Sequence, residues 1–332
     1  MNNSLKVKSP HILITMGDPA GIGPEIIIKT LKHLKNLHQF SIFGDYSVLK
    51  KACLLVNFPI GKLVYNQSKK SRISVRGSQL EKPFHLKDAG KINPKFGKLS
   101  IQWIKEAVEY SHSLRACKIP HAIVTAPINK ESAHLGGFRF AGHTDFLSYL
   151  YEAPETSMMF YSKRLKTILV TIHCSLQSAC KSLNKDFILK KIIHAHHSLR
   201  SWGIAKPEIL VAGLNPHAGE GGAFGQEEKI WITPAIRSAR KKGINATGPY
   251  PPDTIFLKAL NNPSSCVVAM YHDQGLIAFK LLAFSDGVNV TVGLPVTRTS
   301  PDHGTAFDIA WKGIANHKSF FEAVKLALLT QI

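Results

Sequence analysis

Short apolar runs alternate along the chain with longer segments in which apolar residues recur every three or four positions. The short runs have the length and β-branched content of buried strands, and the longer segments have helical periodicity. The predicted strands span residues 11–16, 40–44, 121–127, 167–173, 208–215, 266–272 and 287–293. The predicted helices span 21–37, 97–114, 185–202 and 227–243, with two further helical stretches closing the chain. This alternation predicts an α/β fold with mostly parallel sheets.

Length and composition fit a globular chain with one large domain or two ordinary ones. The chain has 332 residues, of which 44% are hydrophobic and 19% charged. No apolar run approaches the roughly 18 residues of a membrane span, and the apolar run at 11–16 is too short for a signal peptide. The five cysteines form no CxxC pair, which is typical of a reduced compartment. We therefore expect a cytoplasmic protein.

The formal net charge of +20 raises the question of a nucleic-acid or other polyanion partner. Lysines and arginines are scattered, however, and form no basic stripe interleaved with aromatic residues. A solvated basic surface is the preferred interpretation. A non-enzymatic, polyanion-binding protein is the alternative, and it would show salt-sensitive binding and no bound metal.

Three histidines each follow a predicted strand. His173 follows the apolar run at 167–172, His217 follows the stretch at 208–216, and His272 follows the apolar run at 266–271. Ligands of open α/β sheets collect at the carboxyl ends of strands, and three neutral imidazoles suit Zn²⁺ or a similar cation. The competing explanation is coincidence, because the chain has 16 histidines. The "HAHH" cluster at 194–197, for example, has the pattern of a solvated helix face.

The glycine-rich stretch after His217 matches no phosphate-binding motif. Phe224 stands where GxGxxG needs its third glycine, and GxxxxGK[ST], GxSxG and HExxH are absent. Glycines at this place allow sharp turning and a close approach of backbone to a ligand. The stretch is therefore consistent with a loop that presents a metal ligand.

Motifs along nearly the whole chain resemble the 4-hydroxythreonine-4-phosphate dehydrogenase (PdxA) family, in the family's order. They are TMGDPAGIGPE (15–25), AGHTDF (141–146), TIHCSL (171–176), GLNPHAGEGG (213–222), GPYPPDTIF (248–256), AMYHDQGL (269–276) and GVNVTVGLPVTRTSPDHGTAFDIAWKG (287–313). The resemblance implies a two-domain fold similar to isocitrate and isopropylmalate dehydrogenases, not a Rossmann fold, with an active-site cleft between the domains. Residues 1–137 with 285–332 would form an outer domain carrying most of the NAD site. Residues 138–284 would form a central domain carrying the metal ligands and the interface of a homodimer, with the active site near that interface.

The resemblance also implies an activity. It is the oxidation of 4-phosphooxy-L-threonine by NAD⁺ to a 3-oxo acid, which loses CO₂ to give 3-amino-2-oxopropyl phosphate in pyridoxal 5′-phosphate (vitamin B6) biosynthesis. His173, His217 and His272 match the family's metal ligands. Their imidazoles favour Zn²⁺ or Co²⁺ over Mg²⁺, although all three ions occur in the family. A bound cation would lower the pKa of the substrate hydroxyl.

Five positions match the family's substrate contacts: His143, Thr144, Lys280, Asn289 and Arg298. Lysine and arginine suit a doubly charged phosphate. The alternative for Thr144 is a helix cap, and the alternative for Lys280 is a solvated surface lysine.

The remaining candidates are carboxylates and a cofactor segment. Asp253 matches a family aspartate near the substrate that reaches either its own site or the partner subunit's, with a helix cap as the alternative. Asp273 would orient the neighbouring His272. Gly304, Thr305 and Asp308 match the cofactor segment, where a carboxylate on the adenosine ribose favours NAD over NADP.

Metal and NAD positions do not separate this activity from related ones. Dehydrogenases of erythronate or threonate 4-phosphate, and of dihydrodiol acids, share the pattern, although Lys280 and Arg298 favour a phosphorylated substrate. No substitution at these positions indicates an inactive homologue.

Overall fold

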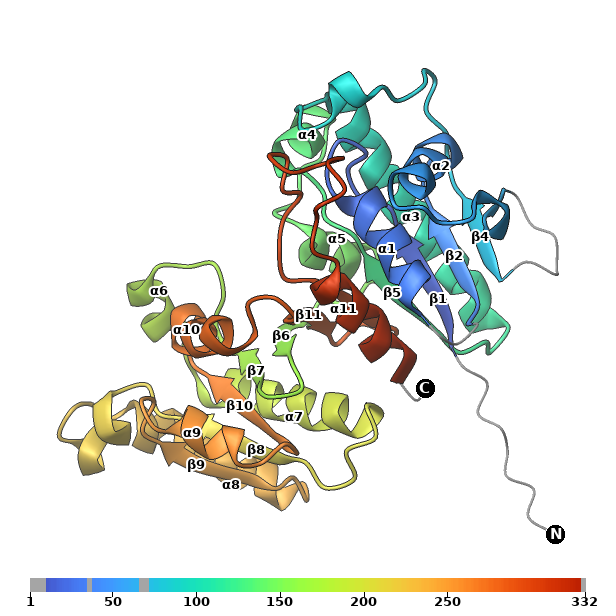
Figure 1. Ribbon diagram of the computed structural model, residues 1–332. Coiled ribbons are helices and arrows are strands. Elements are labelled where there is room, and N and C mark those ends of the chain that lie inside the picture. Colours follow the sequence, from blue (N-terminus) through green and yellow to red (C-terminus); the bar gives the residue numbers. More distant parts are fainter. Residues whose placement is uncertain (1–9, 35–37, 66–71, 330–332) are drawn as a thin grey trace, which may run out of the picture. The chain divides into compact units, whose positions relative to one another are not determined.

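The structure, a computed structural model, describes residues 10–34, 38–65 and 72–329. These residues divide into two compact units (Figure 1). The first unit contains the described residues up to Pro154 and those from Leu294 onward, and the second contains Glu155–Gly293.

The first unit is built on a parallel sheet in the order β3-β4-β2-β1-β5-β12. Its strands are β1 (His11–Thr15), β2 (Phe40–Phe43), β3 (Val64–Tyr65), β4 (Ile73–Arg76), β5 (His121–Thr125) and β12 (Thr297–Pro301). Its helices are α1 (Gly23–His33), α2 (Tyr46–Leu55), α3 (Pro94–Ala116), α4 (Lys130–Leu135), α5 (His143–Leu150) and α11 (Lys318–Leu329), with 3₁₀ turns η1 (Ile60–Lys62) and η2 (Leu86–Asp88). Helices α3 and α11 both pack on β1 and β5, which are buried along their whole length.

The second unit has a mixed sheet in the order β11-β6-β7-β10-β8-β9. Its strands are β6 (Ser157–Tyr161), β7 (Lys166–Leu169), β8 (Glu208–Ala212), β9 (Ala246–Tyr250), β10 (Ser265–Ala269) and β11 (Val288–Val292). Strand β6 runs antiparallel to both neighbours, whereas β7, β10, β8 and β9 are parallel. Its helices are α6 (Leu176–Ser182), α7 (Lys185–Ser201), α8 (Thr233–Lys241), α9 (Ile255–Leu260) and α10 (His272–Ala283), with the turn η3 (Pro216–Gly222) and the π-helical turn η4 (Glu228–Ile232).

Helix starts follow from short polar side chains that accept the first free backbone N–H groups. Asp45 caps α2 through Val48 N at 2.9 Å, and Asn184 caps α7 through Phe187 N at 2.8 Å. Pro24 lies in the first turn of α1, where a missing N–H costs no hydrogen bond. The local sequence therefore determines where these helices begin.

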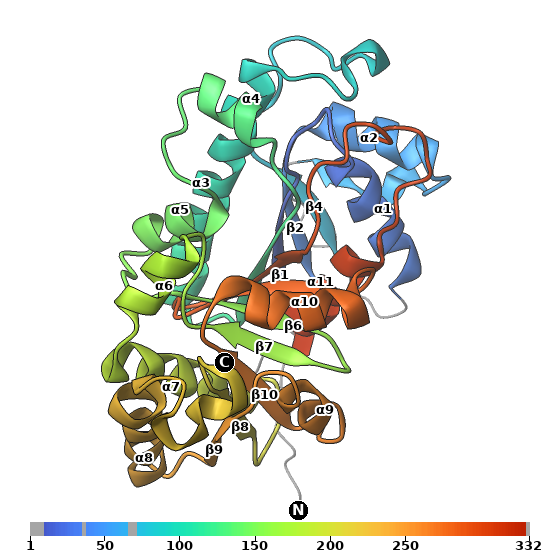
Figure 2. The ribbon, with the colours of Figure 1, turned by 90° about the vertical axis from the view of Figure 1, so that its left-hand side faces the viewer.

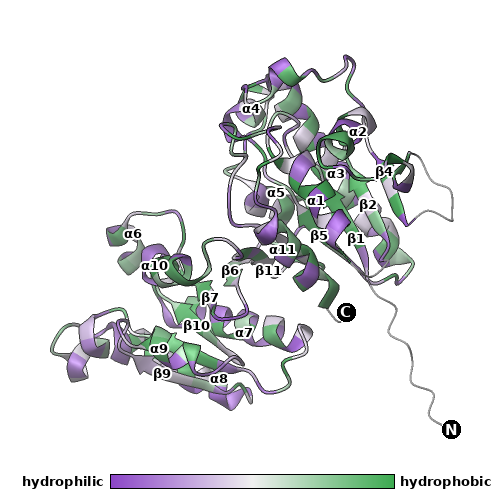
Figure 3. Cartoon of the chain, in the orientation of Figure 1, coloured by the Kyte–Doolittle hydropathy of each residue, from purple (hydrophilic) through white to green (hydrophobic). Residues whose placement is uncertain are grey.

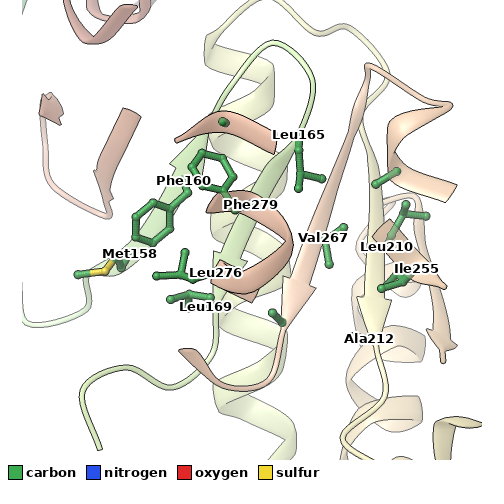
Figure 4. Packing of buried hydrophobic residues seen from close by; sticks show 13 residues of the cluster. Met158, Phe160, Leu165, Leu169, Leu210, Ala212, Ile255, Val267, Leu276 and Phe279 are labelled. Atoms are coloured by element: carbon green, nitrogen blue, oxygen red, sulfur yellow. The ribbon is translucent and has the colours of Figure 1, made fainter. Parts of the chain in front are cut away.

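The core of the second unit packs α10 onto β7 and β10 (Figures 2 and 4). Phe279 is fully buried, and its ring lies 5.4 Å, centroid to centroid, from that of Phe160. Strand β10 is mostly green in Figure 3, whereas helix α8 also carries purple residues. The α/β prediction with mostly parallel sheets is confirmed, and α10 begins shortly after the carboxyl end of β10.

Only one of the two predicted closing helices is found in the described residues, namely α11. Residues 297–301 form β12, and 302–317 form an irregular segment before α11. The segment is shaped by long-range contacts, such as Ile22 N donating to Thr305 O at 3.0 Å and Trp311 Nε1 donating to Pro19 O at 2.8 Å. Such contacts leave no periodic signal in the local sequence.

The unit boundaries differ from the predicted domain boundaries at 138 and 285. Residues 138–154 belong to the first unit because α5 packs on α3, with Phe138 and Phe146 in T-shaped contact at 5.1 Å. Residues 285–293 belong to the second unit because β11 pairs with β6. The assignment of the NAD site and dimer interface to these domains stays a prediction.

The interpretation of "HAHH" as a solvated face is wrong for His194. Its Nδ1 lies 2.7 Å from Ser157 Oγ, and burial lowers the pKa of this imidazole to about 4.

No helix in the described part of the chain has both the length and the apolar character that crossing a bilayer requires.

Candidate functional site

Three adjacent parallel strands of the second unit each end shortly before one of the predicted metal ligands. The strands lie in the order β7-β10-β8, and His173, His272 and His217 follow their carboxyl ends. The carboxyl edge of a parallel sheet is where ligands of α/β proteins bind. All three imidazoles thus leave the sheet at the same edge.

The structure brings His173 and His272 together, with ring centroids 5.9 Å apart. His272 begins α10, is 40% exposed, and its Nδ1 lies 2.7 Å from Asp273 Oδ1. A carboxylate on Nδ1 fixes the ring and leaves Nε2 as the atom available to a metal. The predicted orienting role of Asp273 therefore has a geometric basis.

His217 is exposed and lies in the turn η3, where its backbone φ is +52°. It is not brought to the other two histidines: within residues 10–34, 38–65 and 72–329, no group of three or more His, Cys, Asp or Glu side chains is close enough to hold a metal ion. The chemistry of the donors nevertheless fits, because three imidazoles suit Zn²⁺ or Co²⁺. His173 has a similar left-handed backbone, with φ +45°, a conformation that clusters at functional sites.

Two side chains that the sequence reading missed connect the three strand ends. Buried Gln274 accepts from Met270 N at 2.6 Å and donates to Gly213 O at 2.9 Å, which ties the end of β10 to the end of β8. Thr171 Oγ1 donates to Met270 O at 2.8 Å and so ties in the loop after β7. A sequence signal for Gln274 was available, because this amide stands two positions after the candidate ligand His272 in "YHDQG".

Three other predicted residues lie in this unit. Asn289 is on β11, and its buried Oδ1 has no hydrogen-bond partner among the described residues. Lys280 is on α10, with Nζ 6.0 Å from the centroid of the Phe284 ring. Asp253 is exposed in the turn before α9, whose N-cap is Thr254, so the capping alternative for Asp253 is wrong.

A cavity of about 200 Å³ lies in the first unit, at the carboxyl ends of β5 and β12. Its lining includes Arg298, Lys130, His143 and His303, and the described residues that line it include no carboxylate. Arg298 is only 3% exposed, and one of its guanidinium nitrogens donates to Thr125 Oγ1 at 2.6 Å. Burial lowers the pKa of Arg298 to about 9, so the group is still a cation at neutral pH. The cavity is therefore suited to an anion.

His143 and Thr144 begin α5, and His143 lines this cavity. His143 Nε2 is buried and lacks a hydrogen-bond partner within the described ranges. Burial, followed by the charges of Arg298 and Lys130, holds the pKa of His143 well below its usual value, so the ring is neutral. The N-cap of α5 is Gly142, so the capping alternative for Thr144 is wrong. Lys130, in the first turn of α4, was missed because a single lysine in a basic chain carries no signal.

Gly304, Thr305 and Asp308 lie in the irregular segment after β12. A Cβ placed on Gly304 would meet no atom within 4 Å, so the backbone there is open to a ligand. Thr305 is buried and held by Ile22 N, while Asp308 is exposed. The segment is thus fixed at Thr305 and accessible on either side of it.

The chain is similar to well-described proteins over almost its full length. The family described as pyridoxal phosphate biosynthetic protein PdxA matches residues 36–327. A D-threonate 4-phosphate dehydrogenase of Salmonella typhimurium is 44% identical, over 97% of this chain and 99% of that protein. A 4-hydroxythreonine-4-phosphate dehydrogenase of Desulforapulum autotrophicum is 42% identical, over 96% of this chain and 95% of that protein.

Solved structures agree with the sequence comparisons. The crystal structure of a 4-hydroxythreonine-4-phosphate dehydrogenase from Klebsiella pneumoniae has a TM-score of 0.83 and 40% identity, covering 97% of this chain and all of that one (100%). A β-decarboxylating dehydrogenase of Thermococcus kodakarensis, 14% identical with a TM-score of 0.50 over 96% of this chain and 83% of that one, shares the fold alone. The predicted similarity of fold to that class of dehydrogenase is confirmed.

Proposed function

We propose that this chain, which belongs to the PdxA family, is a metal-dependent dehydrogenase that oxidises 4-phosphooxy-L-threonine with NAD⁺. The resulting 3-oxo acid loses CO₂ and gives 3-amino-2-oxopropyl phosphate, a step of pyridoxal 5′-phosphate synthesis. The observation that carries the proposal is the cavity around the buried guanidinium of Arg298. The enzyme belongs to the oxidoreductases.

The phosphate of the substrate binds to Arg298 and Lys130 in this proposal. Both cations line the cavity, where arginine can bind a phosphate dianion through two parallel hydrogen bonds and lysine as a point charge. His143, neutral at physiological pH, donates or accepts a hydrogen bond through its unsatisfied Nε2. Thr144, Lys280 and Asn289 contribute further polar contacts to the substrate.

The reacting end of the substrate requires a cation site and a hydride acceptor. His173, His217 and His272 would hold the divalent cation, with Zn²⁺ or Co²⁺ preferred over Mg²⁺. When bound, the cation lowers the pKa of the substrate hydroxyl and stabilises the negative charge on its oxygen, while NAD⁺ accepts the hydride. Asp273 holds the His272 ring, and exposed Asp253 takes up a proton or binds the substrate amine.

Asp308 is assigned to the adenosine ribose of NAD, with Gly304 and Thr305 alongside. The exposed carboxylate accepts hydrogen bonds from ribose hydroxyls and repels the 2′-phosphate of NADP.

We also propose that the enzyme is a cytoplasmic homodimer. Asp253 then acts in its own site or in that of the partner subunit.

A second candidate substrate has an observation in its favour. The relative from Salmonella typhimurium, named for D-threonate 4-phosphate, is as similar to this chain as those named for 4-hydroxythreonine 4-phosphate. The two substrates share the phosphate and differ at C2, which bears a hydroxyl in D-threonate 4-phosphate and an amine in 4-phosphooxy-L-threonine. The Arg298 cavity is consistent with both.

The test is NADH formation by metal-stripped protein, before and after addition of Zn²⁺, Co²⁺ or Mg²⁺. D-threonate and D-erythronate 4-phosphates serve as parallel substrates for 4-phosphooxy-L-threonine. We expect metal-dependent turnover of the threonine compound, lost in His217→Ala and retained in His197→Ala, whose exposed ring lies on α7. Turnover of D-threonate 4-phosphate alone would reassign the substrate. Absence of both turnover and metal binding would favour the polyanion-binding alternative.

A further inference from the structure

The loop that carries His217 has an unusual backbone. Residues 217–221 all have left-handed conformations, with φ values of +52° at His217, +54° at Ala218, +82° at Gly219, +42° at Glu220 and +63° at Gly221. This conformation is unfavourable for residues other than glycine, and here three such residues adopt it: His217, Ala218 and Glu220. Contacts from outside the turn must therefore hold it.

The carboxylate of Glu228 makes those contacts. Glu228 is 4% exposed, and its Oε1 accepts from Leu214 N and Asn215 N, both at 2.8 Å. Its Oε2 accepts from Asn215 Nδ2 at 3.0 Å. These bonds fix the chain immediately before His217.

The same carboxylate also lies against the turn after His217. A Cβ placed on Gly219 would come within 2.6 Å of Glu228 Oε2. One buried side chain thus touches the loop on both sides of the histidine, although it lies 11 residues further along the chain.

We propose that Glu228 is a positioning residue that sets the metal affinity of the histidine site by holding the His217 turn in place. The inference rests on the proposed function, since it takes His217 to be a metal ligand. An imidazole on a fixed turn loses less conformational entropy on binding than one on a loose loop. Outer residues that orient metal ligands typically change metal affinity 10–100-fold.

The first test is Co²⁺ binding to metal-free protein, followed by the visible ligand-field spectrum of the ion. In Glu228→Leu we expect the Kd for Co²⁺ to rise about 10–100-fold. At saturating Co²⁺ its spectrum should approach that of His217→Ala, because the third imidazole is no longer held. A residue that only stabilises the fold would leave the spectrum unchanged.

Glu227→Leu is the matched control. The Glu227 carboxylate contacts the same Asn215 Nδ2, at 2.8 Å, and no bond from it to a backbone N–H of residues 214–221 is found in the described chain. Its Co²⁺ affinity should stay within about twofold of the wild-type value, since the bonds from Glu228 to Leu214 N and Asn215 N remain in this variant.

A second pair of variants keeps the charge of Glu228 and tests the contact if Glu228→Leu fails to fold. Gly219→Ala places a methyl against the carboxylate, whereas Gly221→Ala, at a similar φ, meets no atom within 4 Å. Both carry comparable backbone strain, so only the contact differs. We expect weaker Co²⁺ binding in Gly219→Ala than in Gly221→Ala.

Hydrogen exchange in the metal-free protein completes the test, with faster exchange expected across residues 214–221 in Glu228→Leu. Wild-type Co²⁺ affinity in Glu228→Leu, or equal affinities in the two glycine variants, would overturn the inference and leave the proposed function intact. Failure of the wild-type protein to bind Co²⁺, Zn²⁺ or Mg²⁺ would overturn both.

Discussion

Asp18 lies just past the end of β1, with a carboxylate that is fully buried. Its Oδ1 accepts from Ala20 N at 2.9 Å, which holds the turn between β1 and α1. Burial raises the pKa of Asp18 to about 6, against the smaller lowering effects of the Ala20 N–H and the Ser132 hydroxyl. The charged form of this residue is thus disfavoured by the fold.

Replacing Asp18 with asparagine should change how stability depends on pH. The pKa of Asp18 is higher in the folded state than in the unfolded state. The protonated carboxyl therefore stabilises the fold at pH 4, and this stabilisation is lost as pH rises through 6. The loss is on the order of 3 kcal/mol for a shift of this size. We expect Asp18→Asn to match the wild type at pH 4 and to exceed its free energy of unfolding by about 1–3 kcal/mol at pH 7.5.

Urea unfolding at the two pH values measures this difference. Asp186→Asn, at an exposed position in the first turn of α7, serves as the control and should not remove the pH dependence. Parallel pH profiles for wild type and Asp18→Asn would contradict the assignment of a raised pKa.

Arg298→Lys tests whether phosphate binding depends on the planar shape of the guanidinium or only on its positive charge. A lysine keeps the positive charge but loses the planar fork that binds phosphate through two donors, and it loses the bond to Thr125 Oγ1. We expect kcat/KM for 4-phosphooxy-L-threonine to fall about 10–100-fold, mostly through KM, a change of about 1.4–2.7 kcal/mol. Steady-state kinetics measures this, with Arg200→Lys on the exposed face of α7 as control. An unchanged KM would remove Arg298 from the phosphate site.

At the scale of elements, the strands that precede the candidate metal ligands were predicted correctly from the sequence. The histidines after β7, β8 and β10 were chosen as candidate ligands because each follows a strongly apolar run, and parallel strands end at one edge. Gln274 and Glu228 were not identified, since their partners are backbone groups brought close only by folding. Gln274 reaches Gly213, 61 residues away in sequence. No local pattern encodes such a contact.

Gln274→Met tests how strongly this side chain couples the ends of β8 and β10. Methionine has a similar volume but leaves Met270 N and Gly213 O without these partners in a buried place. We expect a loss of about 2–6 kcal/mol in the free energy of unfolding, since each of the two unsatisfied groups costs about 1–3 kcal/mol. Thermal and urea unfolding measure the loss. The same substitution at exposed Gln177 should cost less than about 0.5 kcal/mol, and equal losses at the two positions would contradict the coupling.

At the scale of the whole molecule, the net charge of +20 acts on every anionic substrate. A positive field raises the encounter rate with anions, and salt screens it with a Debye length of about 10 Å at 0.1 M. We expect kcat/KM for a phosphorylated substrate to fall several-fold between about 0.02 and 0.5 M NaCl, with kcat little changed. Stopped-flow and steady-state measurements over this range test the expectation. A fall confined to kcat would contradict an effect on encounter.

The pairing of β5 with β12 joins segments about 175 residues apart, with Ile123 opposite Arg298. During translation the ribosome therefore releases β1, β2, β4 and β5 long before the strand that completes their sheet. The second unit, continuous from Glu155 to Gly293, is fully synthesised first. Until β12 emerges, the nascent chain presents an unpaired, apolar strand edge at β5, which is a natural target for chaperones. The anion cavity, whose walls come from both strands, is consequently among the last features of the enzyme to form.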